Sequence, residues 1–226
     1  MDRYARVLAW ERAAQHADYA AAIHPSGAAG IEGPAWTASG FAHAQEWTQG
    51  LHRWSTDLTL DLTILDFGCG AGRVTHPLAT LWPAARILGV DASPTMLARL
   101  DAAKPPTVGN VTGWLSDGFD GRLPDRVDAV HSMITLLHYS WADGADLLRR
   151  LLAALRPGGI AGVNVPIYDT PTQSADWTGV TTWCPAQLAE AADGLAVVLE
   201  AHCSPGQFRL GVVGPHHGAY QWLRRM

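Results

Sequence analysis

Charged residues are scarce in this sequence. They make up 16% of its 226 residues, below the roughly 25% that is typical of soluble domains, whereas 48% are hydrophobic. A chain so rich in apolar residues is not expected to be disordered. Its net charge of −5 provides no basic excess to attract a phosphate backbone. We therefore expect a folded protein that does not bind nucleic acid.

Cysteine and long apolar runs are also lacking. The three cysteines lie far apart and form no CxxC pair, which argues against a disulfide framework or a zinc knot. We expect no metal site. No uncharged apolar run approaches the ~18 residues that suggest a membrane span, and the first residues carry no apolar signal-peptide core. We expect a cytoplasmic protein without membrane contact; the sequence leaves its oligomeric state open.

Two helical segments are predicted near the start of the chain. Residues 2–22 are uninterrupted by glycine or proline, and residues 41–56 carry an apolar stripe that includes Trp47 and Trp54. Glycines and prolines between them predict a loop over residues 24–40. The stripe predicts that Trp47 and Trp54 pack in a core. Trp10 and Trp36 fit either packing or an aromatic pocket wall.

From residue 60 onward, short apolar runs alternate with helical segments. Strands are predicted over residues 62–67, 86–91, 111–115, 126–133, 159–166, 195–201 and 208–213. Helices are predicted over residues 74–82, 94–103, 143–155 and 185–193. This alternation indicates βαβ units and a parallel sheet, and hence an α/β fold.

A glycine loop follows the first predicted strand. Asp66 ends that strand, and Gly68, Gly70 and Gly72 turn the chain into the next helix. Glycine permits tight backbone conformations and lets a ligand approach the backbone closely. The N–H groups at the start of the helix then face the ligand. A plain tight turn would use the same residues, so both interpretations stay open here.

Acidic residues follow the next two strands. Asp91 lies about 20 residues after the loop, where a carboxylate can accept hydrogen bonds from a ribose diol. Asp117 follows the third strand, next to Gly118. Each aspartate alone also suits a helix cap or a turn. Together with the loop, they mark the carboxyl ends of three strands, the edge where open α/β sheets bind ligands.

These motifs resemble those of class I S-adenosylmethionine-dependent methyltransferases. The resemblance runs from residue 62 to 213, through residues 64–73, 89–97, 116–118, 125–132 and 151–159. It implies a Rossmann-like, doubly wound, seven-stranded and mostly parallel sheet whose last hairpin is reversed. It also implies an N-terminal helical cap or lid over residues 1–58 and a cofactor-binding domain over residues 59–226.

The resemblance implies S-adenosyl-L-methionine as the cofactor. Asp91 stands in the position that holds the ribose, and Asp117 in the position that holds the adenine amino group. The full set of implied contacts is Asp66, Gly68, Gly70, Gly72, Asp91, Ala92, Asp117, Gly118, Ser132 and Met133. Because the sulfonium is a good leaving group, the protein mainly has to align the reacting atoms and exclude water.

Histidine is the side chain best suited to take a proton from a methyl acceptor near neutral pH. The resemblance places the donor methyl group beside His131 and His138, and Tyr168 lies in a long segment after the fifth strand. These three are the candidate catalytic residues. The alternatives are a hydrogen bond in the core for His131, a surface loop for His138 and plain loop structure for Tyr168.

Residues 131–139 lack the Asp/Asn-Pro-Pro-aromatic run of methyltransferases that act on DNA and many proteins. The sequence therefore favours a small-molecule substrate whose oxygen or nitrogen is methylated, in secondary metabolism. One alternative is an enzyme that uses the cofactor without methyl transfer, by cyclisation such as azetidine-2-carboxylate formation or by aminopropyl transfer, and that releases methylthioadenosine. Another is a catalytically silent protein that binds the cofactor.

Overall fold

A computed structural model describes residues 3–15, 33–55, 59, 61–120, 122–175, 179–207 and 219–226. Within them lies one seven-stranded sheet of order β3-β2-β1-β4-β5-β9-β7. Its strands are β1 (Thr63–Phe67), β2 (Arg86–Asp91), β3 (Val111–Leu115), β4 (Val127–Ser132), β5 (Leu155–Asn164), β7 (Ala196–Glu200) and β9 (Tyr220–Arg225). Only β9 runs antiparallel to its neighbours, β5 and β7. The predicted doubly wound, mostly parallel sheet is confirmed.

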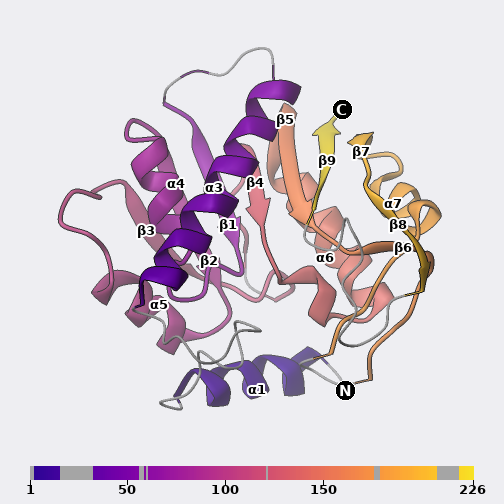
Figure 1. The fold of residues 1–226 in the computed structure, drawn as a ribbon, viewed down its shortest axis with the longest axis horizontal. Coiled ribbons are helices and arrows are strands. Elements are labelled where there is room, and N and C mark those ends of the chain that lie inside the picture. Colours follow the sequence, from indigo (N-terminus) through magenta and orange to yellow (C-terminus); the bar gives the residue numbers. More distant parts are fainter. Residues whose placement is uncertain are drawn as a thin grey trace.

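Helices cover both faces of this sheet (Figure 1). They are α1 (Arg3–Gln15), α3 (Pro34–Trp54), α4 (Thr75–Leu81), α5 (Pro94–Ala102), α6 (Trp141–Ala154) and α7 (Pro185–Ala192), with a short 3-10 turn η1 (Leu136–His138). Strand residues alternate between the faces. Ile64 packs with α3 and α4, and its neighbour Leu65 packs with α6. None of the helices in the described part of the chain is long and apolar enough to cross a bilayer.

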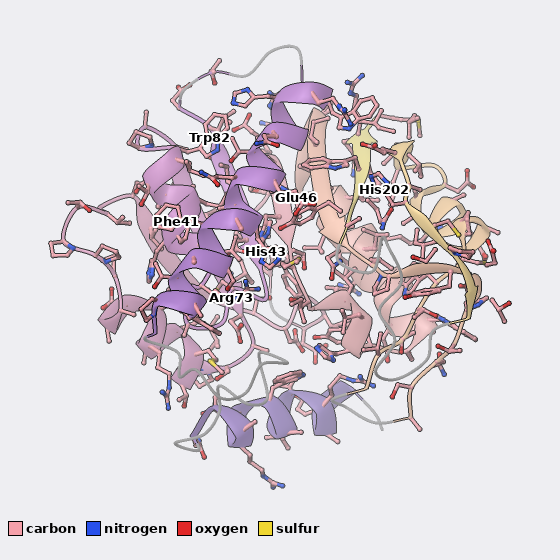
Figure 2. All side chains as sticks on the ribbon, viewed as in Figure 1. Phe41, His43, Glu46, Arg73, Trp82 and His202 are labelled. Atoms are coloured by element: carbon pink, nitrogen blue, oxygen red, sulfur yellow. The ribbon has the colours of Figure 1, made fainter. Side chains whose placement is uncertain are left out.

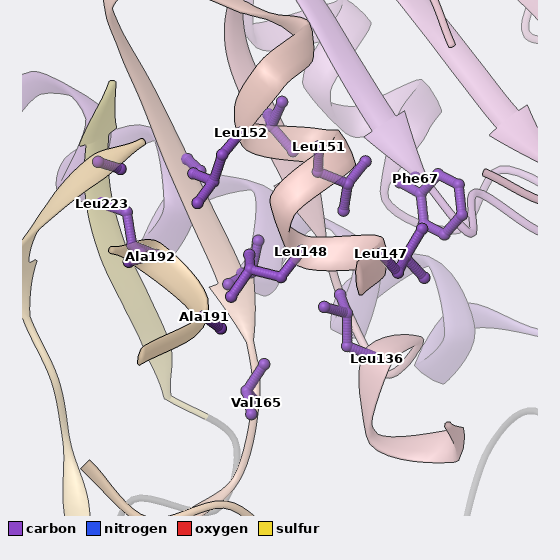
Figure 3. Packing of buried hydrophobic residues seen from close by; sticks show 14 of the residues in the cluster. Phe67, Leu136, Leu147, Leu148, Leu151, Leu152, Val165, Ala191, Ala192 and Leu223 are labelled. Atoms are coloured by element: carbon purple, nitrogen blue, oxygen red, sulfur yellow. The ribbon is translucent and has the colours of Figure 1, made fainter. Parts of the chain in front are cut away.

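Leucines of α6 form the centre of one face of the core. Leu147, Leu148, Leu151 and Leu152 recur at the helical period and are fully buried between the sheet and α7. Figure 3 shows this packing, with Phe67 at the end nearest the glycine loop. Because Phe67 ends β1, the same core also supports the start of that loop.

The other face of the core is built around α3. Trp47 and Leu51 are fully buried, as the apolar stripe predicts. A Cβ atom on Gly162 would lie 2.5 Å from Nε1 of Trp47, so this glycine lets the indole lie directly on β5. The prediction of a loop over residues 24–40 is wrong from Pro34 onward. Pro34 suits the first turn of a helix, and Gly40 allows α3 to pass against the backbone of Arg73.

The end of the chain differs most from prediction. The strand predicted over residues 208–213 lies outside the described residues, and the reversed strand is β9 instead. Part of the long segment after β5, predicted as a loop, forms β6 (Ile167–Thr170), which pairs with β8 (Cys203–Gln207) in a separate two-stranded sheet. β5 itself begins at Leu155, which was predicted to be helical. β5 pairs with β9, and β6 pairs with β8. Because these strands lie far apart in the sequence, local residue patterns do not predict that they pair.

Candidate active site

The glycine loop after β1 has the backbone conformation that only glycine adopts easily. Gly68, Gly70 and Gly72 have φ values of 73°, 53° and 91°. A Cβ atom on Gly68 would lie 2.1 Å from Oγ1 of Thr135, so this glycine is needed for packing. A Cβ atom on Gly70 would meet nothing within 4 Å, so the backbone here borders open space. Gly70 therefore leaves room for a ligand.

A cavity lies at this edge of the sheet. The loops that follow β1, β2 and β4 line it together with Val7 and Trp10 of α1 and Trp36 of α3. Among the predicted site residues, those in its wall are Asp66, Gly68, Gly70, Asp91, Ala92, His131, Met133 and His138. Residues that lie far apart in the sequence thus line one cavity. Trp10 and Trp36, for which the sequence allows either core packing or a pocket wall, both line it.

Asp91 joins the glycine loop to the helix that follows β2. One carboxylate oxygen accepts a hydrogen bond from the Gly70 N–H, and the other accepts one from the Ser93 N–H, both at 2.9 Å. Burial raises the pKa of Asp91 to about 6, although these hydrogen bonds act in the opposite direction. Ser93, not Asp91, caps α5, because its hydroxyl accepts from the Met96 N–H.

Asp66 anchors a buried chain of hydrogen bonds. Its carboxylate accepts from the Thr75 hydroxyl and from Nδ1 of His131, both at 2.6 Å. Since Nδ1 donates, Nε2 of His131 accepts, and the Tyr220 hydroxyl donates to it at 2.9 Å. Burial raises the pKa of Tyr220 well above its usual range, so the phenol stays neutral. Both nitrogens of His131 are therefore engaged within the fold.

His138 lies in the cavity wall beside α1. Its ring centre is 5.0 Å from that of Trp10, and Nδ1 lies 3.3 Å from the carbonyl oxygen of Gly179. A carbonyl only accepts, so the proton sits on Nδ1 and Nε2 keeps its lone pair. Burial, with a smaller contribution from the positive charge of Arg6, lowers the pKa of His138 to about 4, although the hydrogen bond with Gly179 acts in the opposite direction. The imidazole is neutral at physiological pH.

Five predicted site residues do not line this cavity. Ser132 donates to the carbonyl of Phe67 at 3.0 Å, and Gly72 packs against His76 and Leu100. Asp117 accepts from the backbone N–H groups of Phe119 and Asp120 in a turn, and Gly118 packs against Phe67 and Leu147. Tyr168 is buried in β6. Their functional roles stay predictions.

In Figure 1 helix α1 lies below the sheet, and its residues Val7 and Trp10 line the cavity. The Glu11 carboxylate accepts from the hydroxyls of Ser93 and Thr95, both at 2.5 Å, at the N-terminus of α5. Burial raises the pKa of Glu11, but these hydrogen bonds outweigh it, and the pKa falls below its ordinary value. Arg99 donates to the carbonyl of Ala14 at 2.9 Å. These three hydrogen bonds hold α1 against α5.

Sequence reasoning missed several residues at this site. Ile134 has a φ of 55°, a strained value for a β-branched residue, and it lines the cavity directly after β4. Arg6 is 3% exposed, and its Nε has no hydrogen-bond partner. Arg73 lines the cavity next to the glycine loop. The only sign of this in the sequence is that Arg73 is the last residue of the glycine-loop motif, residues 64–73. No group of three potential metal ligands occurs among the described residues.

Comparison with known proteins places this geometry in context. Residues 64–159 match the family model described as a methyltransferase domain. A trans-aconitate 2-methyltransferase from Azoarcus sp. is 35% identical over 113 residues, which are 49% of this chain and 42% of that protein. The match thus spans about two fifths of that relative's length.

Two solved structures show the same fold. The [4+2]-cyclase SpnF has 26% sequence identity and a TM-score of 0.57, and the match covers 68% of this chain and 58% of that one. Magnesium protoporphyrin IX methyltransferase from Synechocystis, crystallised with SAM, has 17% identity and a TM-score of 0.54. That match covers 84% of this chain and 78% of that one.

Proposed function

We propose that the chain, which belongs to the class I S-adenosylmethionine-dependent methyltransferase family, binds S-adenosylmethionine in the cavity at the edge of its sheet and methylates an oxygen or nitrogen of a small molecule. One observation carries this proposal. The open backbone face of Gly70 and the carboxylate of Asp91 border the same cavity and are joined by a 2.9 Å hydrogen bond.

The residues in the wall fit this cofactor. The space beside Gly70, where a Cβ atom would meet nothing, admits a ligand against the backbone. Asp91 would accept hydrogen bonds from the ribose hydroxyls, which compensate a buried carboxylate. Trp10 and Trp36 would offer aromatic faces to a cation. When bound, the cofactor supplies an activated methyl group on a sulfonium. Asp66, Gly68, Ala92 and Met133 complete the proposed contacts.

The protein itself would contribute in two ways, by excluding water from the cavity and by accepting a proton from the methyl acceptor. Helix α1, held to α5 through Glu11, would keep water out of the cavity. Nε2 of the neutral His138 would accept the proton that an O–H or N–H acceptor loses. The fold already uses both nitrogens of His131, so we assign it a positioning role toward Asp66. We do not assign Tyr168 a proton-transfer role, because it does not line the cavity.

Finer parts of the prediction extend this proposal. Asp117 and Gly118 would hold the adenine end, and Gly72 and Ser132 would shape the loop and the strand beneath it. Residues 1–58 would act as the cap and residues 59–226 as the cofactor-binding domain. Secondary metabolism and a cytoplasmic location stay predictions.

The test is a methyl-transfer assay followed by mass spectrometry. The protein is incubated with S-adenosylmethionine carrying a labelled methyl group and a panel of small hydroxy, amino and carboxylic acids, including trans-aconitate. We expect release of S-adenosylhomocysteine and a labelled product, and Gly70→Val should abolish both because its side chain fills the open space. Failure of the folded wild-type protein to bind S-adenosylhomocysteine would contradict the proposal.

A second candidate is use of the cofactor without methyl transfer, by cyclisation or by aminopropyl transfer. The likeness to SpnF, whose structure is described as that of a [4+2]-cyclase, shows that a similar fold occurs in a protein described by a reaction other than methyl transfer. Incubation with S-adenosylmethionine alone separates the two functions. Methylthioadenosine formed without any acceptor supports the second candidate, whereas S-adenosylhomocysteine formed only with an acceptor supports methyl transfer.

A further inference from the structure

Arg73 is a cation without a carboxylate partner in the wall of the cavity. Its Nη1 donates to Nδ1 of His43 at 2.7 Å and to the Ser39 hydroxyl at 3.4 Å, and both partners are uncharged acceptors. Its guanidinium carbon lies 5.6 Å from the centre of the Trp36 ring. Figure 2 labels Arg73 and His43. No ion pair to Arg73 occurs within the described ranges of the chain.

The surroundings of Arg73 disfavour its charge. Burial lowers the pKa of Arg73, although Tyr220 and Asp66 act in the opposite direction. The carboxylate of Asp66 accepts hydrogen bonds from Thr75 and His131 and does not form an ion pair with Arg73. Arg73 also precedes α4, and the N-terminus of a helix repels cations. A fold that keeps a cation in such a place leaves its charge available to an anionic ligand.

A second cavity adjoins the first at Arg73. The two share Trp36, Ala71 and Arg73 in their walls, and the second extends between α3, α4 and α5. His76 and Arg99 also line it, but no aspartate or glutamate does among the residues described. Its apolar walls include the rings of Trp36 and Phe41. Positive charge beside flat aromatic surfaces suits a planar organic anion.

We propose that the methyl acceptor is a small carboxylic acid with a planar skeleton, and that Arg73 binds its carboxylate. This inference rests on the proposed function and names the substrate class. The same chemistry could come from the carboxylate of the cofactor's amino-acid arm. We assign Arg73 to the acceptor because the second cavity, although Ala71 and Gly72 of the glycine loop line it, does not include Gly68, Gly70 or Asp91 in its wall. His43 accepts from Nη1 and positions the guanidinium.

The test is calorimetric titration of the protein saturated with S-adenosylhomocysteine. The probes are 4-hydroxybenzoate, 4-aminobenzoate and trans-aconitate, each compared with its methyl ester. We expect at least one acid to bind at least tenfold more tightly than its ester. Arg73→Gln should weaken binding of that acid at least tenfold, with a smaller loss for Arg73→Lys. Arg122→Gln, which removes an exposed arginine, is the matched control and should bind like the wild type.

Two results would overturn the inference while leaving the proposed function intact. The first is a wild-type protein that binds S-adenosylhomocysteine but none of the three acids in preference to its ester. The second is an Arg73→Gln variant that loses tenfold or more in affinity for S-adenosylhomocysteine but binds methylthioadenosine, which lacks the amino-acid arm, like the wild type. Arg73 would then hold the cofactor. Circular dichroism and the Arg73→Lys variant separate these results from misfolding.

Discussion

Protonation of Asp91 is expected to compete with cofactor binding. Burial raises the pKa of this carboxyl group from 3.8 to about 6 in the free protein. Ribose hydroxyls donate to a carboxylate, so the bound cofactor favours the ionised form. Below pH 6 a proton must leave before the ribose binds. The affinity should then fall tenfold, or about 1.4 kcal/mol, for each pH unit.

The assay is titration of the protein with S-adenosylhomocysteine between pH 5 and pH 8, followed by tryptophan fluorescence. Trp10 and Trp36 line the cavity and serve as reporters. The dissociation constant should be flat above pH 7 and about tenfold higher at pH 5 than at pH 7. Asp91→Asn is the matched control. It should bind more weakly, without this pH dependence, because its amide does not titrate.

The same shift has the opposite sign for folding. A carboxyl group whose pKa is raised in the native state binds its proton more tightly than in the unfolded chain. Its contribution to stability is therefore fully present below pH 3.8 and is lost as the pH rises through about 6. The ionised Asp91 thus favours cofactor binding and disfavours folding stability at neutral pH.

An affinity of the wild-type protein for S-adenosylhomocysteine that does not change between pH 5 and pH 7 would refute the proposed competition between the proton and the cofactor.

Three further predictions concern stability, the lid and catalysis. Gly68→Ala should lower the free energy of unfolding by about 1–3 kcal/mol in thermal or urea melts, because the added Cβ atom collides with Thr135. Gly70→Ala also places alanine at a positive φ, but its Cβ atom meets no other atom within 4 Å, so its free energy of unfolding should fall less. Glu11→Gln should speed protease cleavage near α1 without changing the melting temperature of the sheet, because the charged hydrogen bonds to α5 are lost; an unchanged cleavage rate would show that Glu11 does not hold the lid. His138→Ala should lower kcat roughly 10²–10⁴-fold for an O–H or N–H acceptor and leave the cofactor affinity intact; an unchanged kcat would remove His138 from the mechanism.

Local patterns in the sequence were enough to predict much of the sheet. The strands around Asp66 and Asp91 are short, buried and apolar, and they end in residues that mark the ligand edge. The burial of Trp47 followed from helical spacing alone. The extension of α3 back to Pro34 was missed, because Gly40 suggested a loop although it serves a close contact with Arg73.

The rest of the site depends on contacts between distant residues. Tyr220 reaches His131 across a gap of 89 residues, and Arg73 reaches His43 across 30. No periodicity in the chain encodes these pairs. The sequence allowed His131 to lie either in the core or in the site. Only the structure shows that both of its ring nitrogens form hydrogen bonds, one with Asp66 and one with Tyr220. Side-chain chemistry at the site was therefore less predictable than the backbone that carries it.

The measurement that tests the central claim most directly is a calorimetric titration of the wild-type protein and of Gly70→Val with S-adenosylhomocysteine at pH 7.5. The account predicts saturable binding of one molecule per wild-type chain and no measurable binding to Gly70→Val, because the new side chain fills the space that borders the cavity. A folded wild-type protein that binds no S-adenosylhomocysteine, or a Gly70→Val variant that binds it as tightly as the wild type, would contradict the account.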